Sequence, residues 1–488
     1  MRLALVFNPF KYKLHEENLR IVQKYFGLFP PLSLAWVAAI AERAGHEVII
    51  IDARTLSLSK EDVAGRLRSF GPDIIGFMMT TYMFRETLEW IRYLKERFKV
   101  PVMVGGYNLR VYPVESLSPP EIDFGVVEHA DVTVPRLLEE LEGGRNFSDV
   151  PGLVYREDGK VMVTPKPEGR VDFDSFPMPA RHLLPNHLYA EFPTERKNFT
   201  VLVSSLGCPR RCLFCEAGGT LHNPRRPETV VEEMEECYTR HGIREVDIFD
   251  YEFPCNRKRT LEICRLLNEK DLDMTWACRS RVDSVDEELL REMEAAGCRR
   301  IYYGLESGSQ EILDRINKGI TLDLIRDTIR LTKDTGIRPL GFFLIGSPGE
   351  TRSTVMDTLG FAKELDLDYV QFSKATAKPL TGLWRMLVED EGWDYWKEYI
   401  KGNVEEQPLP RPWTELTNEE IDKLARRAYI HYHSRPGFLI KSLVKIRSFS
   451  EFRRKFLAYL DMVFRQEKVS EKDDLFVAYN EKAIRLPH

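Results

Sequence analysis

Short apolar runs alternate with helix-forming segments along most of the first 375 residues of this 488-residue chain. In the N-terminal part, the apolar runs are residues 3–7, 47–51, 74–78, 102–104 and 124–127. This alternation predicts an α/β fold in which parallel strands form one sheet with helices on both faces. We therefore expect residues 1–150 to form a doubly wound parallel-sheet domain. Such domains bind ligands beyond the carboxyl ends of their strands.

The alternation resumes after a stretch at residues 151–198 that is rich in proline and charge and that we interpret as a linker. Six apolar runs follow, at residues 199–204, 245–249, 274–277, 300–303, 339–345 and 369–373. Six strand–helix units predict a partial, TIM-like (β/α)6 barrel over residues 199–375, with its chemistry at the carboxyl ends of the strands. Residues 376–488 are aromatic and helix-forming, and we expect a helical C-terminal region there.

Three cysteines, Cys208, Cys212 and Cys215, follow the first apolar run of the second part with the spacing C-x3-C-x2-C. Three thiolates on one loop can bind three irons of a four-iron cluster and leave the fourth iron open for a substrate or cofactor. A zinc site with His222 as the fourth ligand is the alternative. Structural zinc usually uses two C-x2-C hooks, and the chain has no second hook.

The remaining composition limits the other classes of function. The net charge of −6 gives no overall basic field, so we expect no nucleic acid partner. The five other cysteines are scattered singly, which is typical of a reducing compartment rather than of a disulfide framework. The N-terminus does not resemble a signal peptide, and no apolar stretch is long enough to span a bilayer. We therefore expect a soluble, cytoplasmic protein.

The cysteine spacing at the end of a predicted strand resembles the signature of the radical S-adenosylmethionine (radical SAM) enzymes. Phe214, the aromatic residue before the last cysteine, also fits the family pattern. The resemblance implies that Cys208, Cys212 and Cys215 hold a catalytic [4Fe–4S] cluster. It also implies that the open iron is chelated by the amino and carboxylate groups of SAM.

Motifs at later strand ends extend this resemblance to SAM binding. Arg279 and Glu306 match the family pattern and carry charges suited to the carboxylate, ammonium and ribose of SAM; an ion pair between the two is the alternative. Gly304 and Gly346 would let the backbone pass close to the ligand. Asp250, together with Glu252, would contact SAM or the substrate. We expect Lys318, in contrast, to lie in solvent.

The cysteine-free α/β domain in front of this motif resembles the cobalamin-binding domain of the B12-dependent radical SAM enzymes. By resemblance, Gly105 and Gly106 allow close approach of the cobalamin nucleotide tail, and Thr80 and Thr81 offer hydroxyl groups to it. Glu128 is the one residue that matches the family's Gly-Glu-Gly-Glu stretch. The D-x-H-x-x-G motif of some B12 proteins is absent. The related methylthiotransferases carry a second cluster on three cysteines in their N-terminal domain. This chain has no cysteine before Cys208, which argues against that class of enzyme.

Two features of the C-terminal region leave alternatives open. A cluster of tryptophan and tyrosine residues at 384–413 predicts either a packed core or one wall of a substrate pocket. Residues 438–465 alternate apolar and basic residues, including Lys441, Lys445 and Arg453. Such a stretch can contact a membrane or an anionic substrate, but a solvated helix face is favoured.

The resemblance implies a cobalamin-dependent radical SAM methyltransferase that methylates an unactivated carbon. In such enzymes a 5′-deoxyadenosyl radical removes a hydrogen atom from the substrate, and methylcobalamin supplies the methyl group. The implied electron donor is a reductase such as flavodoxin or ferredoxin. The alternatives are a cyclisation, rearrangement or oxygen insertion with the same cofactors, or a carrier without turnover. The candidate substrates are a peptide or protein side chain, a lipid and a natural-product intermediate.

Overall fold

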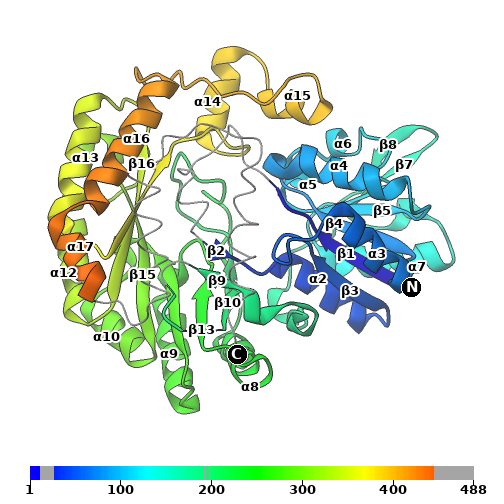
Figure 1. The fold of residues 1–488 in the computed structure, drawn as a ribbon, viewed down its shortest axis with the longest axis horizontal. Helices are drawn as coiled ribbons and strands as arrows, with labels where there is room; N and C mark the ends of the chain where they lie inside the picture. Colours follow the sequence, from blue (N-terminus) through cyan, green and yellow to red (C-terminus); the bar gives the residue numbers. More distant parts are fainter. Residues whose placement is uncertain (11–26, 192–193, 197, 445–488) are drawn as a thin grey trace.

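The structure, a computed structural model, describes residues 1–10, 27–191, 194–196 and 198–444. Two sheets lie side by side, each with helices packed against it, and the N-terminal sheet is on the right in Figure 1. The expected α/β fold class is confirmed.

The first sheet contains the five expected parallel strands. Its order is β3 (Glu47–Asp52), β1 (Arg2–Phe7), β4 (Ile74–Met78), β5 (Val102–Gly105), β6 (Phe124–Val126), β7 (Leu153–Glu157) and β8 (Lys160–Val163). The longer helices of this part are α2 (Leu32–Arg43), α3 (Lys60–Phe70), α4 (Phe84–Lys95) and α7 (Ala130–Glu142). Because the chain passes from β1 to β3 on one side and then to β4 on the other, the order reverses between β1 and β4. In doubly wound sheets, ligands bind beyond the carboxyl ends of the strands at such a switch point.

The strands β7 and β8 were not expected. They pair antiparallel and extend the first sheet from β6, so the segment interpreted as a linker from residue 151 begins inside this sheet. Asp158 and Gly159 connect them with φ angles of 48° and 76°. Two consecutive positive φ angles at Asp-Gly are typical of a type I′ hairpin turn. This Asp-Gly signal was available in the sequence.

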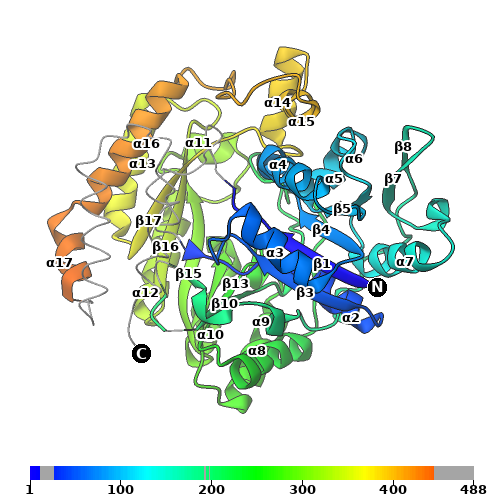
Figure 2. The ribbon, with the colours of Figure 1, turned by 45° about the vertical axis from the view of Figure 1, so that its right-hand side comes forward.

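The second sheet has six parallel strands in chain order, as a partial barrel requires. They are β10 (Phe199–Leu202), β13 (Glu245–Ile248), β14 (Thr275–Ser280), β15 (Cys298–Glu306), β16 (Arg338–Ile345) and β17 (Tyr369–Lys374). The helices between them are α8 (Pro227–His241), α9 (Arg257–Lys270), α10 (Glu287–Ala295), α11 (Gln310–Arg315), α12 (Leu322–Asp334) and α13 (Arg352–Leu365). The longer of these helices cover the outside of the curved sheet (Figure 2). Because the six strands are parallel, all their carboxyl ends lie at the same end of the partial barrel, which we call the barrel mouth.

The C-terminal helices attach to both sheets. They are α14 (Gly382–Glu391), α15 (Tyr395–Lys401), α16 (Asn418–His433) and α17 (Pro436–Val444). Trp396 is fully buried, and its ring lies 5.0 Å from that of Tyr82, in the apolar cluster that also contains Val6 and Phe77 of the first sheet. The aromatic cluster is therefore a packed core that joins α15 to the N-terminal domain, whereas Trp393 is 39% exposed.

The sequence raised two points about membranes: a basic stretch at residues 438–465 and the length of the apolar segments. The basic residues from Lys445 onward lie outside the described residues. Among the described helices, none is both long and apolar enough to cross a membrane.

Candidate functional site

The cysteine loop leaves the second sheet directly after β10 and is closed at its base. Its two ends, β11 (Ser205–Leu206) and β12 (Asn223–Pro224), pair antiparallel. Inside the loop, the Cys208 N–H donates to Thr220 Oγ1 at 3.0 Å. Gly207 has a φ of 76°, and a Cβ there would lie 2.2 Å from the Leu221 carbonyl oxygen. Only glycine suits this position, so Gly207 determines how the backbone turns directly before the first cysteine.

Charged side chains surround the three sulfur atoms. Cys208 Sγ lies 3.6 Å from Glu252 Oε2, and Cys212 Sγ lies 3.6 Å from Arg281 Nη1. Burial raises the pKa of Cys208 to about 12 and that of Cys215 to about 11, and neighbouring negative charges add to both shifts. Iron binds the thiolate, so cluster assembly must displace these protons. The charge of Lys318 favours the thiolate of Cys215.

The geometry of the donors does not resemble a mononuclear metal site. The described part of the chain contains no group of three or more His, Cys, Asp or Glu side chains placed to hold one metal ion. Burial lowers the pKa of His222, and the positive charge of Arg259 adds to the shift. A four-iron cluster places each thiolate on its own iron, so its ligands need not converge on one point. The donor set fits such a cluster.

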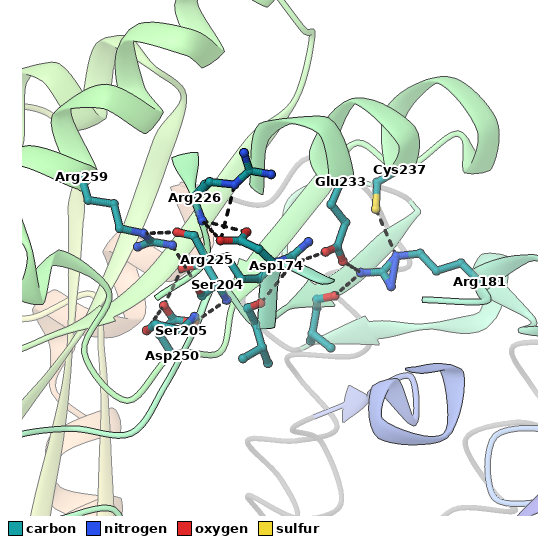
Figure 3. Close-up of polar contacts among 12 residues, drawn as sticks. Asp174, Arg181, Ser204, Ser205, Arg225, Arg226, Glu233, Cys237, Asp250 and Arg259 are labelled. Carbon is teal, nitrogen blue, oxygen red and sulfur yellow. Dashed lines mark hydrogen bonds and ion pairs between the residues drawn. The ribbon is translucent and has the colours of Figure 1, made fainter. Parts of the chain in front are cut away.

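Asp250 holds the base of the cysteine loop, as Figure 3 shows. Its Oδ1 accepts hydrogen bonds from the backbone N–H groups of Ser204 and Ser205, at 2.6 and 3.0 Å. Its Oδ2 accepts from both serine hydroxyls at 2.6 Å. The carboxylate is fully buried, and both oxygens are engaged. Both oxygens serve the chain that leads to Cys208, so the structure gives Asp250 a positioning role. Its contact with SAM or the substrate stays a prediction.

A buried ionic network continues from this point into the segment expected to be a linker (Figure 3). Glu233 on α8 accepts hydrogen bonds from Arg181 Nη2, at 2.6 Å, and from Arg225 Nη1. Arg259 donates to the carbonyl oxygens of Arg225 and Ser204 at 2.7 and 2.8 Å. All these charged side chains are at least nine-tenths buried. The network therefore ties the segment before the barrel to the loop that carries the cysteines.

Arg279 and Glu306 do not pair with each other. Arg279 makes a bidentate contact with Asp247, at 2.6 and 3.1 Å, and its guanidinium lies 3.7 Å from the centre of the Phe249 ring. Glu306 Oε1 accepts from Lys318 Nζ at 2.7 Å. The expectation that Lys318 lies in solvent is wrong: its side chain is 5% exposed, and its buried charge is compensated by Glu306. The Lys318 Nζ also lies 5.8 Å from the centre of the Phe214 ring, near the cysteines.

The two glycines expected to admit SAM also make room for protein atoms. A Cβ at Gly304 would lie 2.5 Å from Glu306 Oε1 and 2.8 Å from Lys318 Nζ. A Cβ at Gly346, where φ is 87°, would lie 2.8 Å from Ile421 Cδ1. Both glycines therefore permit internal packing at the barrel mouth. Close approach of SAM to their backbone stays a prediction.

At the carboxyl edge of the first sheet, some of the residues expected to contact cobalamin remain accessible, whereas others already contact protein atoms. The nearest atom to a Cβ at Gly105 would be Val126 Cβ at 3.9 Å, an ordinary van der Waals contact, so the strand end is not crowded and a ligand could pass close to its backbone. Gly106 has a φ of 125°, and a Cβ there would lie 2.7 Å from the Met79 carbonyl oxygen. The glycine therefore allows its loop to pack against the backbone of Met79. Thr80 is half-buried, whereas Thr81 is buried and donates to Asn108 Oδ1 at 2.9 Å.

Glu128, the remaining expected cobalamin contact, is held in ion pairs. Its carboxylate lies 2.9 Å from Arg110 Nε and 3.0 Å from Lys166 Nζ. It therefore links α5 (Tyr107–Val111) to the segment after β8. Neither cation could be paired with Glu128 from the sequence alone.

The carboxyl edge of the first sheet faces the cysteine loop. Phe214 packs against the apolar cluster that contains Val104 of β5. Tyr107, directly after Gly106, donates its hydroxyl to the Pro379 carbonyl oxygen at 3.4 Å. Burial raises the pKa of Tyr107, and the negative charges of Glu216 and Cys215 add to the shift. These contacts bring the two expected cofactor edges together.

Comparison with known proteins agrees with this arrangement. Residues 202–362 match the family model of the radical SAM superfamily, and residues 20–138 match the B12 binding domain. An uncharacterized methyltransferase of Pyrococcus horikoshii is 34% identical over 86% of this chain and 91% of its own length. The chain belongs to the B12-dependent radical SAM family. Its cofactors are a [4Fe–4S] cluster, SAM and cobalamin.

Two further proteins are similar to this member of the family. The anaerobic magnesium-protoporphyrin IX monomethyl ester cyclase of Rubrivivax gelatinosus is 29% identical over 74% of this chain and 67% of the cyclase. The solved structure of the radical SAM methyltransferase TsrM from Kitasatospora setae, with cobalamin and a [4Fe–4S] cluster bound, superimposes with a TM-score of 0.63. It is 21% identical and covers 80% of this chain and 75% of TsrM, so this likeness concerns the fold.

Proposed function

We propose that this protein is a cobalamin-dependent radical SAM methyltransferase that methylates an unactivated carbon of its substrate. The observation that carries the proposal is the proximity of the carboxyl edge of the first sheet to the cysteine loop. Burial raises the pKa of Tyr107 and the negative charges of Glu216 and Cys215 add to the shift, while Phe214 packs against the apolar cluster that includes Val104. The relative from Pyrococcus horikoshii, which is named a methyltransferase, covers nearly the same length of chain. The two cofactors therefore share one reaction space.

The residues of the chain position the cofactors and exclude water. Cys208, Cys212 and Cys215 would hold the cluster, while Gly105 and Thr80 would border cobalamin. When bound, SAM and the cluster supply a radical that removes a hydrogen atom, and cobalamin supplies the methyl group. The apolar cluster shared by the first sheet and residues 375–413 also packs against Leu213 and Phe214 of the cysteine loop. We expect it to shield the space between the two edges from water. Excluding water there protects reactive species from side reactions.

Product analysis tests this function. Under anaerobic conditions with SAM and a reductant, a methyltransferase forms S-adenosylhomocysteine and 5′-deoxyadenosine, and its product gains one methyl group. The main alternative is a cyclisation, in line with the similarity to the cyclase of Rubrivivax gelatinosus. A cyclisation yields 5′-deoxyadenosine without S-adenosylhomocysteine and adds no methyl group. Formation of 5′-deoxyadenosine alone across candidate substrates would contradict the proposal.

Removal of one cysteine provides the matched test of the cluster. Cys208→Ala should abolish both iron binding and reductive cleavage of SAM, because the loop then offers only two thiolates. Cys255→Ala, on the short turn Phe253–Cys255 near the mouth, should retain both. A Cys208→Ala variant that still formed 5′-deoxyadenosine would refute the assignment of the cysteine loop.

A further inference from the structure

A cavity opens beside the cysteine loop on the side of α14. Its volume is about 290 Å³. Its wall includes Cys212 and Cys215, together with Gly218, Leu380 and Arg385 of the neighbouring segments. Two of the three cysteines therefore line a surface cavity, and a cluster bound to them would lie close to the outside of the protein here.

The rim of this cavity carries two exposed arginines, Arg211 and Arg385. Neither forms an ion pair with another residue in the described part of the chain. Arg210, next in sequence, differs: it lies 3.5 Å from Asp283 and 3.6 Å from Glu252. In a chain whose net charge is −6, two uncompensated guanidinium groups beside the cluster form a local positive surface.

The proposed function requires an electron to arrive at this cluster from outside. The five remaining cysteines are free thiols, and Cys278 and Cys298 lie next to each other. The described residues contain no group of three or more His, Cys, Asp or Glu side chains placed to hold a metal, so these cysteines provide no second cluster to relay electrons. The donor must therefore transfer its electron directly to the cluster. Electron transfer slows steeply with distance, so the donor must dock where the cluster lies closest to the surface.

We propose that the cysteine loop and the first turn of α14, around this cavity, form the docking surface for a small acidic one-electron carrier. This inference rests on the proposed function. In the transfer, the carrier is oxidised by one electron and the cluster is reduced by one electron. Arg211 and Arg385 would face the carboxylates around the carrier's redox group. Charge complementarity of this kind mainly accelerates association and makes it sensitive to salt.

Charge reversal at the rim tests the proposal. We compare the wild type with Arg211→Glu/Arg385→Glu in stopped-flow reduction of the assembled cluster by reduced flavodoxin, a small acidic flavoprotein. The second-order rate constant should fall at least about tenfold at low ionic strength, and its dependence on salt should weaken. The matched control, Arg66→Glu/Lys99→Glu, makes the same charge change at exposed positions that do not line the cavity. It should retain a rate close to that of the wild type.

A second measurement separates this proposal from the proposed function. With excess dithionite, the double variant should show the same final extent of cluster reduction, the same electron paramagnetic resonance spectrum and the same final yield of 5′-deoxyadenosine as the wild type. Three results would overturn the docking surface: an unchanged rate with flavodoxin, an equal loss in the control variant, or failure of flavodoxin to reduce the wild type. Loss of 5′-deoxyadenosine formation from the wild type with dithionite would instead contradict the proposed function.

Discussion

Asp250 accepts four hydrogen bonds at the base of the cysteine loop, and its substitution tests how far one buried carboxylate determines cluster binding. Asp250→Ala leaves the backbone N–H groups of Ser204 and Ser205 without an acceptor. Each unsatisfied buried donor costs about 1–3 kcal/mol. We expect a loss of roughly 3 kcal/mol in the free energy of unfolding. Iron content after reconstitution should fall as well, because the loop loses its anchor.

Two variants make this prediction specific. Asp250→Asn should have a smaller effect than Asp250→Ala, because the amide oxygen still accepts from both backbone N–H groups and the serine hydroxyls can turn to accept from the amide. Asp334→Ala, at the exposed end of α12, should leave iron content and thermal unfolding unchanged. Equal iron content in all three variants would show that Asp250 does not position the loop.

At the scale of an element, the loop between β16 and α13 folds around its own carboxylate. Glu350 is fully buried, and its Oε2 accepts from the backbone N–H groups of Gly346 and Ser347. Trp413 and Thr414 of the C-terminal region donate to the carbonyl oxygens of Gly346 and Glu350, at 2.8 and 2.7 Å. Burial raises the pKa of Glu350 from 4.5 to about 7, against the effect of the two backbone donors.

This shift predicts a dependence of stability on pH. The folded state binds the Glu350 proton more tightly than the unfolded state, so its contribution is fully present below pH 4.5 and is lost as the pH rises through about 7. At about 1.4 kcal/mol per pKa unit, the loss is on the order of 3 kcal/mol. Glu350→Gln removes this titration. The thermal midpoint of the variant, relative to the wild type, should therefore rise between about pH 5 and pH 8.

An exposed glutamate of the same charge provides the control. Glu389→Gln, on α14, should give a thermal midpoint that runs parallel to that of the wild type over the same pH range. If the curves of Glu350→Gln and the wild type were also parallel, the carboxyl group would not titrate differently in the folded and unfolded states.

At the scale of the whole molecule, the sequence predicted what local patterns determine. The six strands of the barrel follow from apolar runs of the right length, and the cysteine loop follows from the cysteine spacing directly after the first of these runs. Partners that come from distant segments could not be predicted. Lys318 follows an Asn and precedes a Gly, a context typical of an exposed turn, and only the fold places Glu306 beside it. Likewise, Arg279 meets Asp247 from a neighbouring strand rather than Glu306.

The attachment of the C-terminal helices to the first sheet is another property that emerges only from the complete fold. Trp396 donates its indole N–H to the Ala377 carbonyl oxygen at 2.7 Å, and its ring packs edge-on against Tyr82. Tyr82 lies in the turn Thr81–Met83, directly after Thr80 at the expected cobalamin edge. One buried tryptophan therefore supports both the junction between the parts of the chain and the loop that we expect to border cobalamin.

Truncation of the Trp396 side chain should weaken both the junction of α15 with the first sheet and the loop that follows Thr80. Trp396→Ala removes a fully buried indole, which typically costs about 3–5 kcal/mol. Hydrogen–deuterium exchange should therefore become faster in residues 80–83 and 395–401, and titration followed by absorbance should show weaker cobalamin binding. Trp393→Ala truncates an exposed tryptophan two residues before α15, and it should change neither measurement. If Trp396→Ala lost stability but retained wild-type cobalamin affinity and protection at residues 80–83, the tryptophan would only fill the core. The C-terminal helices would then play no part in shaping the cobalamin edge.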